Sequence, residues 1–219
     1  MDVPIVSVLE HYEKLIEEGN DPVHDSKVAQ EYMNRWDGPE FFRALGSCTN
    51  KRVLEVGVGT GRLAKTILDK GCRHFTGIDI SPKTIERAKM NLSRFKNCNL
   101  SVEDIEQYQK PSYFDVAYSV LTFMHIQNKE VALGNMIASI CKGGYIVISI
   151  SNENEWLDFG NRKIKLYSIG IHEYQRYFEA MGCMVDPPIE LLDTYEKGMS
   201  SKSQRTKVAT LIKATKLFD

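Results

Sequence analysis

A short stretch of the chain, residues 52–62, joins a strand pattern, a glycine-rich turn and the start of a helix pattern. The mostly apolar run 53–56 predicts a buried strand, and glycines at positions 57, 59 and 61 follow it directly. An apolar pattern with helical spacing begins at Leu63. Glycine adopts positive φ angles and carries no side chain, so a ligand can lie against the free backbone N–H groups of the helix start. The stretch therefore predicts an α/β fold with a binding turn for a polar or anionic ligand.

The spacing of the glycines argues against two common nucleotide-binding turns. The dinucleotide pattern G-x-G-x-x-G needs a third glycine where this chain has Arg62. The triphosphate-binding pattern G-x-x-x-x-G-K-S/T also fails, because no Gly-Lys pair follows Gly57 at the required distance. Nicotinamide dinucleotides and nucleoside triphosphates are therefore disfavoured as ligands.

A carboxylate, Asp79, ends the second apolar run, residues 75–78. It lies roughly 20 residues beyond the glycines, so it belongs at the carboxyl end of the neighbouring parallel strand, where a ribose-binding acid is expected. There it can accept hydrogen bonds from both ribose hydroxyls, each contributing about 1.5–3 kcal/mol. The glycine turn and Asp79 together predict a ligand that contains a nucleoside.

These motifs resemble those of the class I S-adenosylmethionine-dependent methyltransferases. The resemblance is carried by Glu55, Gly57, Gly59 and Gly61, and then by Asp79, Ile80, Ser81 and Pro82. Residues 102–105 resemble the third motif of the family, residues 114–119 its fourth strand, and residues 140–150 the Gly-Gly turn that leads into its fifth strand. The usual proline of that turn is missing. The resemblance is specific over residues 50–150 and covers the rest only by general layout.

The resemblance implies a cofactor, S-adenosylmethionine, with S-adenosylhomocysteine as its product, and a role for each matching residue. Glu55 and the backbone of Gly57, Val58, Gly59 and Gly61 would hold the methionine end. Asp79 would hold the ribose, and Ile80 would lie against the adenine ring. Asp104 and Ile105 would read the adenine edge, and Ser119 would close the floor near the sulfonium.

Three of these roles have alternatives within the sequence. Glu55 can instead cap a helix or pair with Arg62. Glu103, next to Asp104, can take over its role, and Ile80 is of a type that often packs in a core. We keep these alternatives open at this point.

Alternating patterns predict a doubly wound α/β fold with helices on both faces of a mostly parallel sheet. Strands are expected near residues 53–56, 74–79, 99–102, 114–119 and 144–150, and helices near 63–69, 82–95, 129–140 and 172–181. Two further strands, over 184–195 and 207–215, would complete seven strands as a C-terminal antiparallel hairpin, as the family layout implies. Residues 51–219 would form this single domain.

Residues 1–50 are expected to form a helical lid over the open end of the cofactor cleft. Asp2 and Pro4 suit the start of a first helix that ends at Gly19. A second helix is expected after Asp25, with a break at residues 37–39 before a short apolar segment. The lid offers four candidate pocket residues, although an aromatic stripe at helical spacing is more often part of a core: Tyr12, Tyr32, Arg35 and Trp36.

Methyl transfer from a sulfonium is an in-line displacement, so few residues need be catalytic. His125 follows the fourth predicted strand, where the family places residues that face the substrate, and imidazole titrates in the useful range. We therefore select His125 as a candidate base or substrate ligand. The alternative is that it packs at a helix start and bonds to a backbone carbonyl.

Composition limits the class of partner and the compartment. A net charge of −1 gives no overall attraction to nucleic acid or to a membrane surface. The five cysteines form no C-x-x-C pair and are odd in number, so neither a metal site nor a disulfide framework is predicted. The start of the chain lacks a signal-peptide pattern, and no apolar run is long enough to span a membrane. A cytoplasmic protein is the expectation.

The acceptor class is narrowed by motifs that the chain lacks. The Asn/Asp-Pro-Pro-Tyr motif of nucleobase amino methylation is replaced here by Ser119-Val-Leu-Thr122, and no cysteine follows a proline, as cytosine C5 methylation requires. The basic segment 197–218 has no interleaved stacking aromatics, which favours a solvated hairpin face over contact with phosphate. We therefore predict methyl transfer to a small molecule, with nucleic acid disfavoured. The alternatives are a regulatory or scaffold module that binds cofactor without turnover, an RNA or protein methyltransferase, and a nicotinamide oxidoreductase.

Overall fold

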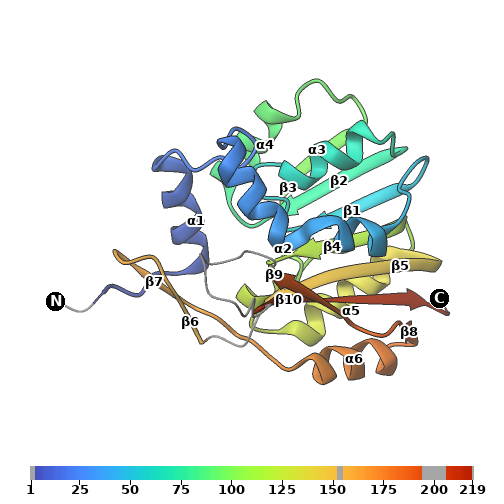
Figure 1. Ribbon diagram of the computed structural model, residues 1–219. Helices are drawn as coiled ribbons and strands as arrows, with labels where there is room; N and C mark the ends of the chain where they lie inside the picture. Colours follow the sequence, from blue (N-terminus) through green and yellow to red (C-terminus); the bar gives the residue numbers. More distant parts are fainter. Residues whose placement is uncertain (1–2, 152–154, 194–205, 219) are drawn as a thin grey trace, which may run out of the picture.

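The computed structural model describes residues 3–151, 155–193 and 206–218, except for the side chains of six of them: Tyr32, Arg35, Trp36, Asp193, Thr206 and Lys207. Its centre is an eight-stranded sheet with the order β3-β2-β1-β4-β5-β10-β8, in which β9 also pairs with β10 (Figure 1). The parallel strands are β1 (Arg52–Val56), β2 (His74–Asp79), β3 (Cys98–Val102), β4 (Phe114–Val120) and β5 (Ile140–Ser151). The antiparallel strands are β8 (Cys183–Val185), β9 (Ile189–Asp193) and β10 (Thr206–Lys216).

The strand order reverses between β1 and β4. The chain builds β1, β2 and β3 outward in one direction and then returns to place β4 on the other side of β1. In open α/β sheets, ligands bind in the crevice outside the carboxyl ends of the strands at such a reversal. The topology therefore places the ligand site beside the ends of β1 and β4.

Helices cover both faces of the sheet (Figure 1). One face carries α2 (Lys27–Leu45), α3 (Arg62–Asp69) and α4 (Pro82–Asn91), and the other carries α5 (Lys129–Ser139) and α6 (Ile171–Ala180). On the first face Phe41 and Tyr118 are fully buried in the core, and on the second Phe114 and Met136 are. The predicted doubly wound α/β fold with a C-terminal antiparallel strand pair is confirmed.

The sixth predicted strand differs from the expectation. The segment 184–195 was expected to be continuous, but the structure divides it into β8 and β9, both paired with β10. Pro187 and Pro188 lie between them, and proline has no N–H to donate to a strand ladder, so the strand is interrupted there. The predicted loop that follows lies at residues 194–205, outside the described residues.

The N-terminal helices also begin and bend differently. The first, α1 (Val8–Glu17), starts later than Asp2 and Pro4 suggest, because Ser7 caps it by accepting a hydrogen bond from the N–H of Glu10 at 3.1 Å. The helix α2 has non-helical dihedral angles at Gly38, which confirms the predicted break. Beyond that bend, Phe41 and Leu45 are fully buried in the core of the sheet domain. The division of the chain at residue 50 stays a prediction.

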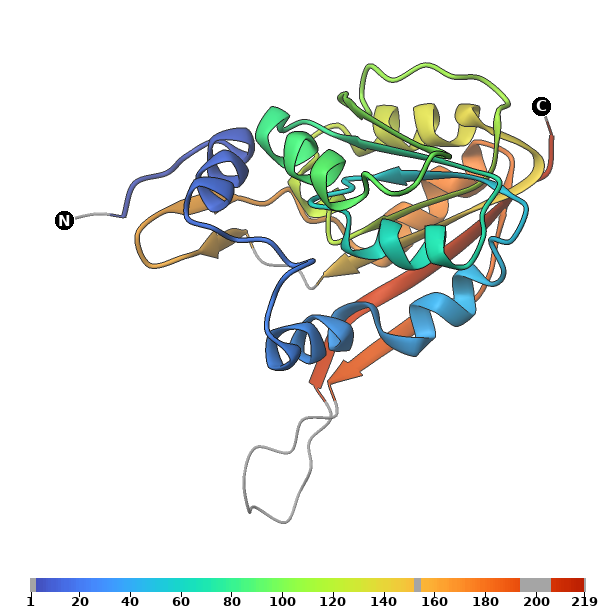
Figure 2. The same cartoon turned by 90° about the horizontal axis from the view of Figure 1, so that it is seen from above.

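A two-stranded hairpin, β6 (Trp156–Asp158) and β7 (Lys163–Lys165), was missed by the sequence analysis. It lies beside α1 at one end of the molecule (Figure 2), and Ile5 pairs with Lys163. The strands are too short for an alternating pattern to be legible.

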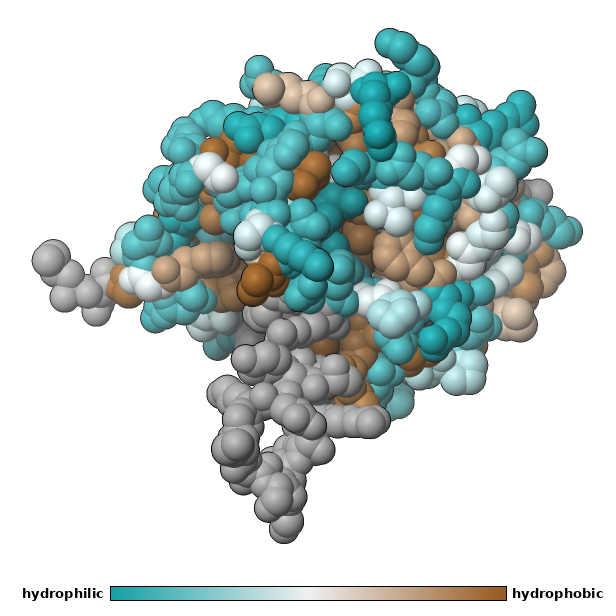
Figure 3. Space-filling model, turned by 45° about the horizontal axis from the view of Figure 1, so that its top comes forward, coloured by the Kyte–Doolittle hydropathy of each residue, from teal (hydrophilic) through white to brown (hydrophobic). Residues whose placement is uncertain are grey.

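On the face shown in Figure 3, the described surface is mostly hydrophilic, and apolar residues occur in small groups. Within the described residues, no helix is both long enough and apolar enough to cross a bilayer.

Candidate active site

A cavity of about 390 Å³ opens at the carboxyl ends of β1, β2 and β4, where the topology places the ligand site. Its walls come from the turn after β1, the ends of β2 and β3, the segment after β4 and the N-terminal helices. The cavity brings together nearly all the residues selected from the sequence: Tyr12, Glu55, Gly57, Val58, Gly59, Asp79, Ile80, Asp104, Ile105 and His125.

The glycine turn has the backbone conformation that its sequence predicts. Gly57, Gly59 and Gly61 have φ angles of 77°, 55° and 96°, a region that favours glycine. A Cβ atom on Gly57 would lie 2.1 Å from the Oγ1 atom of Thr122, so this position has no room for a side chain. Gly61 does not line the cavity, and its place at the N-cap of α3 aims the free N–H groups of that helix into the turn.

Asp79 ends β2 and is held by two backbone N–H groups. One carboxylate oxygen accepts from Gly59 at 3.1 Å and the other accepts from Ser81 at 3.0 Å. Burial raises the pKa of Asp79, against these hydrogen bonds, which lower it. The carboxylate is therefore fixed beside the glycine turn, with acceptor capacity left for a ligand.

The loop after β3 supplies the next part of the wall. Ile105 is buried, and the carboxylate of Asp104 accepts from the N–H of Glu106 at 2.9 Å. Glu103 lines the cavity as Asp104 does, so the alternative between these two acids stays open. Ile80 also lines the cavity, and its 37% exposure shows that it is not a core residue.

Glu55 is buried at the end of β1 and bonds to a second buried residue. Its carboxylate accepts from the hydroxyl of Tyr118 at 2.8 Å. Burial raises the pKa of Glu55 to about 8, against the Tyr118 hydrogen bond and the charge of Arg62. Arg62 itself forms its ion pair with Asp37, just before the bend in α2, so the alternative pairing of Glu55 with Arg62 is not formed.

Ser119 requires a correction. It is fully buried and does not line the cavity, and its hydroxyl donates to the carbonyl of Val56 at 2.8 Å. The reason is that Ser119 still lies within β4, where its hydroxyl satisfies the last carbonyl of the neighbouring strand β1. The cavity wall at this point is formed by the residues that follow: Val120, Leu121 and Thr122.

His125 ends a short 3₁₀ helix, η1 (Phe123–His125), and meets a residue of the lid. Its Nε2 atom lies 2.9 Å from the hydroxyl oxygen of Tyr12. Its Nδ1 atom is buried and has no hydrogen-bond partner among the described residues. Burial, followed by the charges of His11 and Lys129, lowers the pKa of His125 to about 4, so the ring is neutral at pH 7. The bond to a backbone carbonyl, which the alternative interpretation of His125 required, is absent from the described contacts.

The segment that carries His125 is held by a buried lysine that the sequence analysis did not select. The ammonium of Lys129 donates to the carbonyl of Ile126 at 2.6 Å and to the carbonyl of Tyr167. The N–H of Tyr167 in turn donates to the carbonyl of Met124 at 2.8 Å. No sequence motif reveals this contact, because it depends on a connection between residues 126 and 167.

The N-terminal segment, residues 3–50, contributes more residues to the cavity wall than the aromatic pattern predicted. Tyr12 reaches the cavity as predicted, whereas the side chains of Tyr32, Arg35 and Trp36 lie outside the described part of the structure. Three apolar lid residues that the sequence analysis did not select also line it: Val8, Pro22 and Met33. Nothing but apolar character marks them in the sequence.

The arrangement fits the cofactor that the resemblance implies. A nucleoside with an amino-acid end needs an acid for its ribose, an apolar surface for its base and an anionic partner for its ammonium. Asp79, the Ile80 and Ile105 side chains, and Glu55 supply these in one cavity, beside a turn where a side chain on Gly57 would collide with Thr122.

Comparison with known proteins agrees with this fit. Residues 48–184, more than half of the chain, match the family described as "Methyltransferase domain". Malonyl-(acyl-carrier protein) O-methyltransferase 2 of Ilyobacter polytropus is 33% identical over 107 residues, which are 48% of this chain and 41% of that protein. Ubiquinone biosynthesis O-methyltransferase of Nitrosomonas europaea is 25% identical over 183 residues, which are 73% of this chain and 77% of that protein.

A solved structure extends the comparison to the fold. The N-methyltransferase NodS of Bradyrhizobium japonicum, in complex with S-adenosyl-L-homocysteine, has a TM-score of 0.68, with 96% of this chain and 99% of that chain covered. At 17% identity, this likeness concerns the fold alone. The chain spans about two fifths of the length of the malonyl-(acyl-carrier protein) relative. By its sequence match, its fold and its cavity, the chain belongs to the class I S-adenosylmethionine-dependent methyltransferases, with S-adenosylmethionine as cofactor.

Proposed function

We propose that the protein transfers the methyl group of S-adenosylmethionine to an oxygen of a small-molecule acceptor, with His125 as the base. The observation that carries the proposal is that one cavity is lined by Glu55, Asp79 and His125, and that the Nδ1 atom of His125 has no hydrogen-bond partner among the described residues. The cofactor supplies an electrophilic methyl group on a sulfonium. The chain supplies binding, orientation and a place for one proton.

In this proposal, the cofactor is held by residues on three strand ends. Glu55 and the backbone of residues 57–61 hold the methionine end, and Asp79 holds the ribose. Ile80 lies against the adenine ring, and Asp104 and Ile105 read its edge. The assignment of Glu55 requires it to lose the proton that burial favours, and the ammonium of the ligand provides the charge that makes this possible.

His125 has the geometry and the protonation state of a base. If its Nε2–H donates to Tyr12, its Nδ1 lone pair is free to take the hydroxyl proton of the acceptor while the methyl group moves from sulfur to oxygen. The Tyr12 oxygen then faces the positive charge that forms on the ring. Because its pKa is about 4, His125 is a weak base, which suits an acidic hydroxyl such as a phenol or an enol.

The acceptor class rests on the wall around His125. Several residues that line the same cavity as His125 are apolar: Leu121, Met124, Ile126, Val8 and Met33. Such a wall excludes water and suits an apolar acceptor with one ionisable hydroxyl. Two of the relatives are named as O-methyltransferases, which supports an oxygen acceptor.

The experiment incubates the protein with methyl-labelled S-adenosylmethionine and a fractionated cell extract. We expect the label to enter an apolar, low-molecular-mass fraction and to resist mild base treatment, because a methyl ether, unlike a methyl ester, is stable to alkaline hydrolysis. Label in the RNA or protein fraction would show that the acceptor is RNA or protein and not a small molecule. Binding of S-adenosylhomocysteine without any methyl transfer would favour a regulatory module.

A further inference from the structure

The helix α1 is a wall of the cavity, yet much of its surface is exposed. Val8 and Tyr12 line the cavity, while Leu9 on the same helix is 42% exposed. An exposed helix of ten residues has little stability of its own, so contacts with the rest of the chain must hold it in place. The position of Tyr12 therefore depends on what fixes α1.

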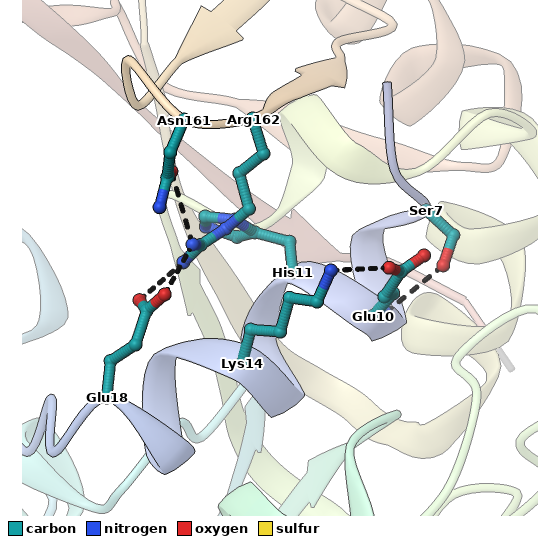
Figure 4. Close-up of polar contacts among 7 residues, drawn as sticks. All are labelled: Ser7, Glu10, His11, Lys14, Glu18, Asn161 and Arg162. Carbon is teal, nitrogen blue, oxygen red and sulfur yellow. Dashed lines mark hydrogen bonds and ion pairs between the residues drawn. The ribbon is translucent and has the colours of Figure 1, made fainter. Parts of the chain in front are cut away.

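A buried arginine from the β6–β7 turn provides such a contact (Figure 4). The guanidinium of Arg162 donates to the two carboxylate oxygens of Glu18 at 2.6 and 2.7 Å, and its Nε donates to the Nδ1 of His11 at 2.8 Å. It also contacts the side chain of Asn161 at 3.3 Å. Arg162 is 4% exposed, whereas the Glu18 side chain that it bonds to is half-exposed, so the guanidinium is shielded from water mainly on the side of His11. His11 on α1 and Glu18 at its C-cap, about two helical turns apart, are thus tied to one side chain.

His11 connects this contact to the cavity. Because its Nδ1 accepts from Arg162, the ring is neutral with the proton on Nε2, and its ring lies 4.1 Å from that of Phe159 in the same turn. The ring of the next residue, Tyr12, packs edge-on against that of His11, with 5.2 Å between the ring centroids, and its hydroxyl reaches His125. A shift of α1 at His11 therefore moves Tyr12 as well.

The opposite side of α1 is fixed to the start of α4. Glu13 accepts from the hydroxyl of Ser81 and from the N–H of Lys83, each at 3.1 Å. The helix thus bridges the β2–α4 turn, which carries the residue after Asp79 and Ile80, and the β6–β7 hairpin. Without the Arg162 contact, the backbone bonds of Lys163 to Pro4 and Val6 still hold the chain just before α1, but the helix itself loses its side-chain contact with the hairpin and can move relative to the cavity.

We propose that Arg162 is a positioning residue for the cofactor site: through Glu18 and His11 it holds α1 over the cavity and so slows the release of S-adenosylhomocysteine. The proposal rests on the cofactor assignment made above. Arg162 touches neither cofactor nor acceptor, and it acts through the helix. Because α1 forms part of the cavity wall, a change that loosens this helix is expected to act mainly on the dissociation rate of the ligand.

The test measures the dissociation rate of S-adenosylhomocysteine by stopped-flow displacement, for the full chain and three variants. We expect Arg162→Met to raise the rate about tenfold or more. Arg162→Lys should give a smaller rise, because one ammonium cannot bond to both carboxylate oxygens and to His11 in the same geometry. Lys14→Met is the matched control: it breaks the exposed Glu10–Lys14 pair on the same helix and should leave the rate unchanged (Figure 4).

A second measurement does not depend on the ligand. Hydrogen exchange of the cofactor-free protein should become faster in α1 for Arg162→Met, while β1 and β4 keep their protection. Glu18→Gln, which keeps the shape and removes the charge, should show the same pattern to a smaller extent and serves if Arg162→Met fails to fold. Wild-type protein that does not bind S-adenosylhomocysteine would overturn the proposed function and this inference together. If the wild type binds S-adenosylhomocysteine normally, and neither Arg162→Met nor Glu18→Gln changes the release of this ligand or the hydrogen exchange of α1, the role of Arg162 alone is overturned.

Discussion

The hydroxyl of Tyr12 and the Nε2 atom of His125 lie 2.9 Å apart, although 113 positions separate them in the chain. One residue belongs to the first helix and the other to the segment after β4. Their contact occupies one ring nitrogen of His125 and leaves Nδ1 without a partner among the described residues. The contact from α1 therefore determines which ring nitrogen of His125 could accept a proton from an acceptor.

This pair predicts a separation between turnover and binding. His125→Gln should lower the rate of methyl transfer about 10²-fold or more, because the acceptor proton has no base. Tyr12→Phe should lower it less, since the imidazole remains. Neither change should weaken the binding of S-adenosylhomocysteine, measured by calorimetry, by more than about threefold, because neither side chain contacts the cofactor in the proposal. Unchanged turnover in His125→Gln would exclude the base role.

Asp79 should dominate cofactor affinity. Asp79→Ala is expected to weaken the binding of S-adenosylhomocysteine, measured by calorimetry, at least about tenfold, because two charge-assisted hydrogen bonds are lost. Part of the loss can come from the turn, since the carboxylate also fixes Gly59 and Ser81. Asp79→Asn keeps the shape and one acceptor, so it should retain more affinity than Asp79→Ala. Equal affinity in the wild type and both variants would contradict the ribose assignment.

Glu55 predicts a pH dependence of stability in the cofactor-free protein. Burial raises its pKa from 4.5 to about 8, so between these values the folded state holds a proton that the unfolded state has released. The free energy of unfolding should then fall as pH rises through this window, by up to about 1.4 kcal/mol per pH unit from this group. Urea unfolding at several pH values measures the slope, and Glu55→Gln should reduce it. A slope that is the same in the variant would show that Glu55 does not titrate in this range.

Two glycines of the turn should respond differently to alanine. Gly57→Ala combines a positive φ with a collision against Thr122, so we expect a loss of about 2–4 kcal/mol in urea unfolding. Gly59→Ala meets no atom within 4 Å and should cost only the backbone term, about 1–2 kcal/mol. Adding Thr122→Ala to Gly57→Ala should restore part of the difference. If both single variants lose the same stability, packing at Gly57 does not matter.

The sequence predicted the sheet domain well because its signals are local. Each parallel strand is a short apolar run next to a turn residue, and the glycines and Asp79 occupy strand ends that the pattern itself defines. The cofactor side of the cavity follows from these positions. It was also predictable that the bend at Gly38 would interrupt α2, because Gly-Pro is a strong local break.

The remaining differences depend on contacts between distant residues. Ser119 was placed in the cavity from its motif position, but the structure uses its hydroxyl on Val56 of the neighbouring strand. The start of α1 was shifted by pairing of Pro4 and Val6 with Lys163, a residue in a hairpin too short to detect. The Lys129 contact to Tyr167 is likewise invisible until the fold is known. In each case tertiary hydrogen bonds decided the outcome over local pattern.

The attachment of α1 to the β6–β7 hairpin has a consequence for biosynthesis. The backbone of Lys163 bonds to Pro4 and Val6, and Arg162 bonds to Glu18. The hairpin residues that hold α1 are therefore translated much later than α1 itself. At a synthesis rate of about 5–20 residues per second, the β6–β7 hairpin leaves the ribosome roughly ten to thirty seconds after α1 does. The contact of α1 with the β2–α4 turn can therefore form well before its contact with the hairpin, which completes the docking of the helix beside the cavity late in synthesis.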